Sequence, residues 1–234
     1  MAQKMKQEHF TTEFLSYLRV LPEDHNPSSS YTVIILLHGY GSHMGDLAGL
    51  APMINNTDFV YIYPNAPLEI DLGLGRRGYA WFPPSGDSDD SSGSNISDSV
   101  TLLDATISDA LDTLPVVKDK VLLGGFSQGG MMTLHYGLLR PNLFSGAISL
   151  SSKILDKTYL STNINTQKRM PIYISHGNLD QVIPVSEGRS SKEFLLDAGY
   201  EVDYFEYTMG HEISTENIDD LRQWLNRLNC NTNK

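Results

Sequence analysis

The chain has 234 residues, 40% of them hydrophobic and 19% charged, and this length and composition predict a single globular domain spanning residues 1–234. Its 17 basic and 28 acidic residues give a formal net charge of -11, which argues against a nucleic acid or an anionic membrane surface as a partner. The one cysteine excludes an internal disulfide bond and any metal site built from several cysteines.

The chain begins with a polar segment. Residues 1–9 include two lysines but no apolar run after them, so they lack the pattern of a secretory signal. No stretch of the chain is apolar over a length that could span a bilayer. We therefore expect a cytoplasmic protein without stable membrane insertion, in which residues 1–13 and 229–234 form flexible ends.

Short apolar runs alternate with segments of helical periodicity along the rest of the chain. The runs predicted as strands cover residues 14–21, 31–37, 58–63, 121–124, 145–150, 171–175 and 202–208. The segments predicted as helices cover residues 100–114, 131–140, 186–198 and 214–228. The runs at 31–37 and 58–63 are apolar on both faces, which is typical of parallel strands covered by helices. The alternation predicts an α/β fold with a mostly parallel central sheet and helices on both faces.

Residues 68–99 interrupt this alternation and are predicted to be irregular. Within them, the acidic residues 85–95, rich in serine and glycine, predict a mobile loop, and long loops often cover or line a binding site. Asp87, Asp89 and Asp90 suggest calcium, but the glycine and final glutamate of an EF-hand loop are not in their positions. We therefore interpret these residues as a solvated acidic loop.

The stretch Gly125-Phe126-Ser127-Gln128-Gly129 lies between a predicted strand and a predicted helix. A serine at so sharp a turn is held in a strained backbone conformation, and the flanking glycines let neighbouring backbone pass closely; this is the nucleophile elbow pattern. The first N–H groups of the following helix have no partner within the helix and carry its positive end. Ser127 is therefore a candidate nucleophile, and the N–H of Gln128 a candidate donor to an oxyanion.

A second candidate donor lies just beyond the strand at 31–37, in His38-Gly39-Tyr40-Gly41. Glycines at the carboxyl end of a strand let backbone N–H groups point into a crevice, so the N–H of Tyr40 can complete an oxyanion hole. These residues alone leave open the alternative that the segment only shapes a turn.

Asp180 and His211 each lie in a loop just after a predicted strand. In a parallel sheet such loops gather at one edge, which is also where ligands bind. A carboxylate can orient an imidazole, which then takes the proton of a serine as general base. The chain order of Ser127, Asp180 and His211 is that of the α/β-hydrolase fold. His176, which also follows a strand, is the alternative base.

Four motifs carry a resemblance to a known family: Leu37-His38-Gly39-Tyr40-Gly41, Gly125-Phe126-Ser127-Gln128-Gly129-Gly130, His176-Gly177-Asn178-Leu179-Asp180-Gln181-Val182-Ile183-Pro184 and Gly210-His211-Glu212. They resemble the signatures of the phospholipase/carboxylesterase family, which includes bacterial carboxylesterases and acyl-protein thioesterases. The resemblance implies an α/β-hydrolase fold without a large cap domain. It also implies a triad of Ser127, Asp180 and His211, an oxyanion hole from the N–H groups of Tyr40 and Gln128, and no cofactor or metal.

The chain departs from the family pattern ahead of its acidic loop. The family often has Trp-Phe-Asp, whereas this chain has Trp81-Phe82-Pro83-Pro84 followed by a longer insertion. The insertion lies where the resemblance places contacts with an acyl chain. Trp81 and Phe82 are candidates either for the core or for the wall of a substrate pocket, and Val182 is a third candidate for that pocket.

Together these features predict a serine carboxylic-ester hydrolase that cleaves short- to medium-chain acyl esters of small molecules through an acyl-enzyme on Ser127. The alternative is an acyl-thioesterase or lysophospholipase that uses the same triad on longer acyl chains. A binding module that keeps the fold without turnover is a more remote alternative. The sequence does not predict the oligomeric state, and a homodimer is compatible with it.

Overall fold

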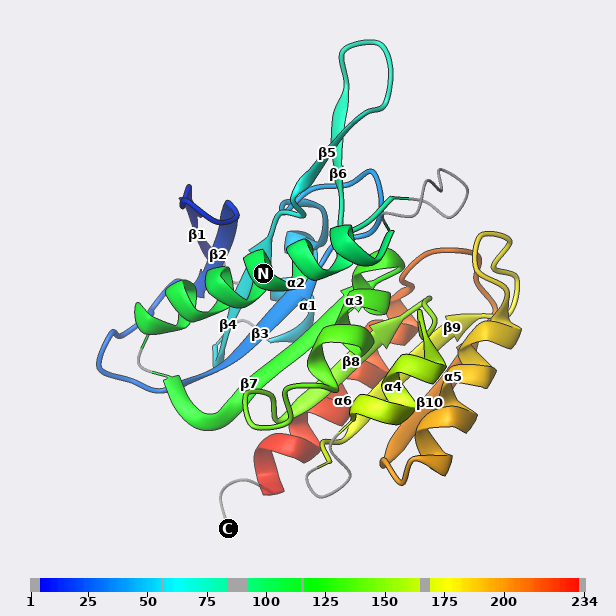
Figure 1. Cartoon of the computed structure of the whole chain (residues 1–234). Coiled ribbons are helices and arrows are strands. Elements are labelled where there is room, and N and C mark those ends of the chain that lie inside the picture. Colours follow the sequence, from blue (N-terminus) through cyan, green and yellow to red (C-terminus); the bar gives the residue numbers. More distant parts are fainter. Residues whose placement is uncertain (1–4, 56, 84–91, 115, 165–168, 232–234) are drawn as a thin grey trace.

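The computed structural model describes the chain except for residues 1–4, 56, 84–91, 115, 165–168 and 232–234. At its centre lies an eight-stranded sheet with the order β1-β2-β4-β3-β7-β8-β9-β10 (Figure 1). Its strands are β1 (Met5–Phe10), β2 (Tyr17–Pro22), β3 (Tyr31–Leu37), β4 (Phe59–Pro64), β7 (Val116–Phe126), β8 (Gly146–Leu150), β9 (Ile172–Gly177) and β10 (Val202–Tyr207). β1 and β2 are antiparallel to their neighbours, and every pair from β4 to β10 is parallel. The prediction of a mostly parallel sheet is confirmed.

Helices cover both faces of this sheet (Figure 1). They are η1 (Asp46–Leu50), α1 (Ala51–Ile54), α2 (Ser92–Asp112), α3 (Gln128–Gly137), α4 (Lys157–Asn163), α5 (Val185–Asp197) and α6 (Thr215–Asn231). Buried residues of α2, α3, α4 and α5 belong to one hydrophobic cluster, whereas those of α1 and α6 belong to another. The two clusters are the two faces of the sheet, so the predicted three-layer arrangement is confirmed.

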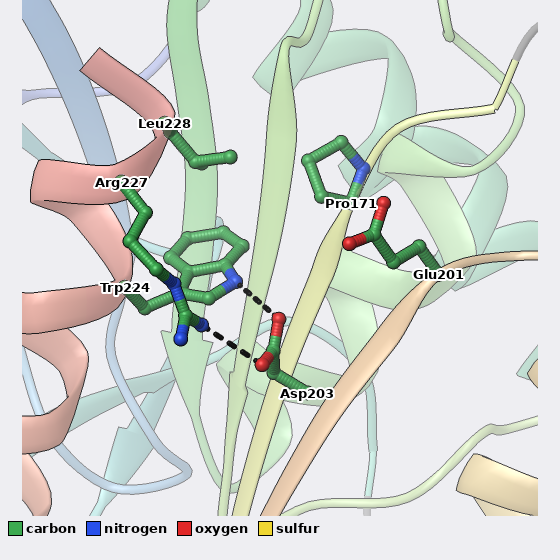
Figure 2. Close-up of a pocket in the computed structure, with 6 residues that line it drawn as sticks. All are labelled: Pro171, Glu201, Asp203, Trp224, Arg227 and Leu228. Carbon is green, nitrogen blue, oxygen red and sulfur yellow. Dashed lines mark hydrogen bonds and ion pairs between the residues drawn. The ribbon is translucent and has the colours of Figure 1, made fainter. Parts of the chain in front are cut away.

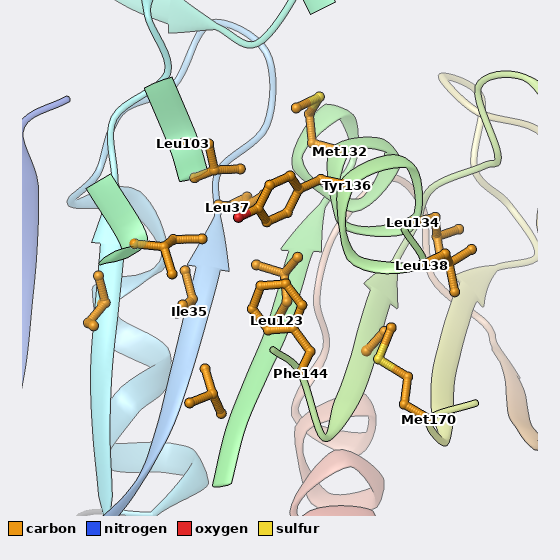
Figure 3. Packing of buried hydrophobic residues seen from close by; sticks show 14 of the residues in the cluster. Ile35, Leu37, Leu103, Leu123, Met132, Leu134, Tyr136, Leu138, Phe144 and Met170 are labelled. Carbon is orange, nitrogen blue, oxygen red and sulfur yellow. The ribbon is translucent and has the colours of Figure 1, made fainter. Parts of the chain in front are cut away.

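The continuous apolar run of β3 is explained by these two clusters. Alternate side chains of a strand point to opposite faces, and Ile35 and Leu37 pack in the first cluster while Ile34 and Leu36 pack in the second. In Figure 3, Ile35 and Leu37 lie on the side of the sheet that faces Tyr136 of α3. Because both faces of β3 are covered, its carboxyl end is fixed where the next residues begin the site.

The segment 68–99, predicted to be irregular, contains a β-hairpin. β5 (Leu68–Asp71) and β6 (Arg77–Ala80) pair antiparallel and project from the body of the molecule (Figure 1). Its half-exposed strands are short and mix apolar and charged residues, so they give little periodic signal. At its base, the N–H of Gly41 donates to the carbonyl of Tyr79 at 2.9 Å, and the N–H of Tyr79 donates to the carbonyl of Ser42 at 2.8 Å. The hairpin is thereby tied to the turn that follows β3.

The ends of the chain are more ordered than predicted. Residues 5–10 of the expected flexible N-terminus form β1, which pairs with β2 along its whole length. Arg19 of β2 binds the carboxylate of Glu8 at 2.7 Å, and Phe10 stacks on Tyr17, so this largely polar edge strand is held by pairing, charge and one aromatic contact. At the other end, α6 continues to Asn231 and takes in the first residues of the predicted flexible tail.

Two further boundaries also differ from the sequence prediction. α2 begins at Ser92, so the last part of the predicted mobile loop at 85–95 is helical, and the remainder lies outside the described residues. β7 spans Val116–Phe126, so it begins several residues before the apolar run at 121–124 from which a strand was predicted. The three aspartates considered for calcium also lie outside the described residues. Within the ranges described, no helix has both the length and the apolar character needed to cross a membrane.

Candidate active site

Ser127 lies at the turn between β7 and α3 in a backbone conformation that side chains rarely adopt. Its φ is 55° and its ψ is -120°, and such a residue costs about 1–3 kcal/mol of strain. The flanking glycines make the turn possible. A Cβ on Gly129 would lie 2.0 Å from the carbonyl oxygen of Leu37, and a Cβ on Gly125 would lie 2.3 Å from the carbonyl carbon of Gly129. The sequence therefore folds into the elbow that its glycine spacing predicts.

Neighbouring strand ends hold this turn in place. The N–H of Ser127 donates to the carbonyl of Leu150 at 2.9 Å, and the hydroxyl of Ser152 donates to the carbonyl of Ser127 at 2.8 Å. The buried Ser151, between Leu150 at the end of β8 and Ser152, has a φ of 45°. Because both the N–H and the carbonyl of Ser127 are hydrogen-bonded to residues at or just after the end of β8, these residues fix the direction of the Ser127 side chain. Ser151 and Ser152 were not predicted as site residues, because their only signal in the sequence is their place just after a predicted strand.

The structure brings Ser127, Asp180 and His211 together in one chain of hydrogen bonds. The Nε2 atom of His211 lies 2.9 Å from the Oγ atom of Ser127, and its Nδ1 atom lies 2.7 Å from the Oδ2 atom of Asp180. A carboxylate can only accept, so Nδ1 carries the proton and Nε2 is free to accept the serine proton. The His211 side chain is 17% exposed and that of Asp180 is fully buried. This arrangement can deprotonate a serine hydroxyl during attack.

Asp180 is held as a carboxylate by its own loop. Its Oδ1 atom accepts the N–H groups of Val182 at 2.8 Å and Ile183 at 2.9 Å. Burial raises the pKa of the Asp180 carboxyl, but the hydrogen bonds from His211, Ile183 and Val182 outweigh burial and keep this pKa below its ordinary value. Asp180 is therefore ionised at neutral pH and can stabilise a positive charge on His211.

The two predicted oxyanion donors flank the serine. A Cβ on Gly39 would lie 3.3 Å from the Cβ of Ser127, so the turn that carries Tyr40 packs directly against the elbow. Gln128 is the first residue of α3, and the first N–H groups of a helix have no partner within it. Within the described part of the chain, neither backbone N–H, of Tyr40 or of Gln128, forms a hydrogen bond. Both are available to an oxygen bound beside Ser127.

His176, the alternative base, is not in contact with the serine. Its ring is fully buried, and its Nε2–H donates to the carbonyl of Ile183 at 2.8 Å. The same nitrogen lies 3.5 Å from the Oδ2 atom of Asp180. His176 therefore braces the loop that carries Asp180, and the hypothesis that it is the general base is wrong.

The three predicted pocket residues have different environments. Trp81 is fully buried in the core, so its interpretation as a pocket wall is wrong, and the alternative that it belongs to the core is supported. Phe82 is partly buried against the same cluster. Val182 is 67% exposed beside Asp180. Of the three, Val182 is the most open to a substrate.

A separate pocket lies far from these residues (Figure 2). Its volume is about 450 Å³, and it is lined by Pro171, Glu201, Asp203, Trp224, Arg227 and Leu228. It lies at the amino ends of β9 and β10, whereas the triad lies at the carboxyl ends of the strands. The pocket is therefore not part of the candidate site. Among the described residues, no three His, Cys, Asp or Glu side chains are grouped so that they could hold a metal ion.

A comparison with known families agrees with this geometry. A model of the phospholipase/carboxylesterase family matches residues 24–229 of the chain. The chain belongs to the phospholipase/carboxylesterase family. The resemblance predicted from the four motifs is thereby confirmed.

Relatives in the phospholipase/carboxylesterase family include proteins named as thioesterases and as esterases. Acyl-protein thioesterase 1 of Gibberella zeae is 29% identical over 230 residues, which cover 89% of this chain and 96% of the relative. Acyl-protein thioesterase 1 of Yarrowia lipolytica is 29% identical over 208 residues, which cover 82% and 89%. The solved structure of esterase PE8 superposes with a TM-score of 0.77 at 26% identity, over 92% of this chain and 99% of that one. The chain is accordingly a serine hydrolase of the esterase/thioesterase kind.

Proposed function

We propose that the chain hydrolyses acyl thioesters and acyl esters through an acyl-enzyme on Ser127. The observation that carries the proposal is the unbroken hydrogen-bonded chain from Ser127 Oγ through His211 to Asp180, with distances of 2.9 and 2.7 Å. The Oγ atom attacks the carbonyl carbon of the substrate while His211 Nε2 takes its proton. The carbonyl oxygen becomes an oxyanion and accepts the N–H groups of Tyr40 and Gln128.

The tetrahedral intermediate then collapses. The bond to the leaving group breaks, and His211 returns the proton to the alcohol or thiol that departs. Water next attacks the acyl-enzyme, giving its proton to His211, and a second collapse releases the carboxylic acid and restores the Ser127 hydroxyl. Asp180 stays ionised throughout and stabilises the imidazolium of each step. No cofactor is needed for this cycle.

The rim of the site favours an apolar acyl group. Tyr40 is 46% exposed beside the oxyanion turn, and Leu179 and Val182 are 60% and 67% exposed on either side of Asp180. The N–H of Leu179 donates to the carbonyl of Met209, so this leucine lies against the loop that carries His211. Exposed apolar side chains beside a reactive group gain free energy by covering an acyl chain. Relatives named acyl-protein thioesterase support the thioesterase alternative, which the sequence analysis pairs with longer acyl chains, over the short-chain esterase predicted first.

This proposal predicts how rate depends on acyl length. We expect kcat/KM for esters and thioesters to rise from acetyl toward longer chains by up to about tenfold for every two methylenes that the rim covers, because each buried methylene contributes about 0.8 kcal/mol. The test is hydrolysis of p-nitrophenyl esters, and of the matching thioesters of N-acetylcysteamine, from two to sixteen carbons. The double variant Leu179→Ser with Val182→Ser should flatten this rise without changing the rate on the acetyl substrate.

The matched control is Leu196→Ser, since Leu196 is 45% exposed on α5 and carries no role in the proposal. It should leave the whole length profile unchanged. A wild-type rate that is greatest with acetyl and falls with each added pair of carbons would contradict the longer-chain proposal. That result would favour the second candidate, a short-chain carboxylesterase; the similarity to esterase PE8 supports an esterase activity.

A further inference from the structure

Three hydrogen bonds beside the oxyanion turns, two of them buried and one partly buried, have no part in the mechanism above. The indole Nε1–H of Trp81 donates to the carbonyl of His38 at 2.9 Å. The backbone N–H of Trp81 donates to the side-chain Oε1 of Gln128 at 2.8 Å, and the Nε2 of Gln128 donates to the carbonyl of Phe82 at 2.7 Å. Trp81 is thus bonded at one end to the β3 turn and at the other to the start of α3.

The two segments that Trp81 joins, the β3 turn and the start of α3, carry the two N–H donors of the proposed oxyanion hole. His38 lies two residues before Tyr40, and Gln128 is itself the second donor residue. β3 and β7 are neighbouring strands, so their pairing already sets the coarse distance between the turns. The pairing of β3 with β7 ends at Leu37 and Gly125, so beyond that point other contacts hold the two turns relative to each other. Trp81 and the Gln128 side chain provide a link between them.

The β3 turn is rigid where Trp81 binds it. Burial lowers the pKa of His38 to about 4, so its ring is neutral at physiological pH. Its Nδ1–H donates to the carbonyl of Gly39 at 2.8 Å, and its Nε2 accepts the N–H of Ala66 at 3.0 Å. The carbonyl that receives the indole N–H therefore belongs to a buried residue whose two ring nitrogens are both hydrogen-bonded, so a shift of Trp81 would be passed to the β3 turn.

The link is shielded from water. Trp81 is 0% exposed, His38 2% and Gln128 5%. In such surroundings a hydrogen bond is electrostatically stronger than in water, and an unpaired donor or acceptor is costly. The two turns are consequently held at one separation, which is what a preorganised oxyanion hole requires.

We propose that Trp81, together with the side chain of Gln128, is a positioning element that sets the separation of the Tyr40 and Gln128 N–H groups in the oxyanion hole. This inference rests on the proposed function, because it concerns the same oxyanion. It assigns Trp81 a role beyond filling the core, and gives the Gln128 side chain a role distinct from that of its backbone N–H. The positions of donors matter strongly, since misplacement by about 1 Å can cost on the order of 100-fold in rate.

The decisive variant is Trp81→Phe, which keeps an aromatic ring but removes the indole N–H. We expect kcat to fall on the order of 10- to 100-fold while KM stays within about twofold, because the oxyanion forms in the transition state and the tetrahedral intermediate and is absent from the bound substrate. The inhibition constant of an acyl trifluoromethyl ketone, whose carbonyl becomes an oxyanion when Ser127 adds to it, should rise by the same factor as kcat/KM falls. A core defect alone would not produce this parallel change.

Trp224 offers a matched control. It is 2% exposed, and its indole N–H also donates to a protein acceptor, Asp203 Oδ2 at 3.0 Å, but it lies in the opposite core cluster. Trp224→Phe should cost a similar amount of thermal stability and leave kcat and the inhibition constant within about twofold of wild type. If Trp81→Phe behaves in the same way as Trp224→Phe, Trp81 is a core residue only and the inference is overturned.

A second variant keeps the test informative if Trp81→Phe does not fold. Gln128→Met preserves side-chain length and the backbone N–H but loses both side-chain hydrogen bonds, and it should show the same fall in kcat at constant KM. Unchanged kcat and inhibition in Gln128→Met would refute the role of this side chain. Failure of the proposed function has a different signature: wild type would then be inactive, or Ser127→Ala would be as active as wild type.

Discussion

Replacing Ser127 with alanine should lower kcat by about six orders of magnitude, since the nucleophile and its base act as one unit. Alanine fits the same backbone, where φ is 55°, and removes only the oxygen that lies 2.9 Å from His211 Nε2. The fold should therefore be retained. The measurement is the rate of ester hydrolysis by purified wild type and variant, with the thermal unfolding temperature of each recorded beside it.

The control for this variant is Ser186→Ala, which removes the hydroxyl of an exposed serine in the first turn of α5. It should hydrolyse the ester at the wild-type rate. Residual activity of Ser127→Ala within a hundredfold of wild type, in a sample free of contaminating esterase, would be incompatible with Ser127 as the nucleophile.

Asp180→Asn is expected to lower kcat by about four orders of magnitude while the protein remains folded. The amide oxygen can still accept the N–H groups of Val182 and Ile183. Its NH₂ group then faces His211 Nδ1 and can only donate, which forces the proton of the imidazole onto Nε2. A protonated Nε2 cannot accept the proton of Ser127. The loss comes from the wrong tautomer and from the missing negative charge.

This prediction is checked by steady-state kinetics together with the unfolding temperature. Asp197→Asn is the matched control, because Asp197 is an exposed carboxylate near the end of α5. It removes the same charge from the chain and should leave kcat unchanged. Near-normal turnover by Asp180→Asn would mean that another group orients His211.

The residues of the candidate site were predictable because each belongs to a local pattern with a physical cause. At Gly125 and Gly129 the neighbouring backbone lies so close that a Cβ would clash with it, so only glycine fits. The spacing of the two glycines therefore indicates the elbow. Asp180 and His211 follow buried strands, and parallel strands bring such loops to one edge. The sequence thus predicts which side chains meet without any knowledge of the loops between them.

What could not be predicted depends on contacts between distant segments. Trp81 looks like a pocket aromatic in sequence, and its hydrogen bonds to His38 and Gln128 join residues 43 and 47 positions apart. β1 is largely polar and only partly buried, so it has no regular apolar pattern, and its pairing with β2 makes it a strand. The hairpin of β5 and β6 could not be predicted either, because its short strands mix apolar and charged residues and show no clear period. These features arise from tertiary pairing, which overrides weak local preference.

The central claim, that Ser127 is the nucleophile activated by His211, is tested most directly by covalent labelling. In the reaction with an alkyl fluorophosphonate, the serine Oγ forms a bond to phosphorus, fluoride leaves, and the serine proton passes to the base. Peptide mass spectrometry should find one phosphonyl group per chain, on Ser127, with no label in Ser127→Ala and much slower labelling in His211→Ala. A label on another residue, or equal labelling of Ser127→Ala, would contradict the account.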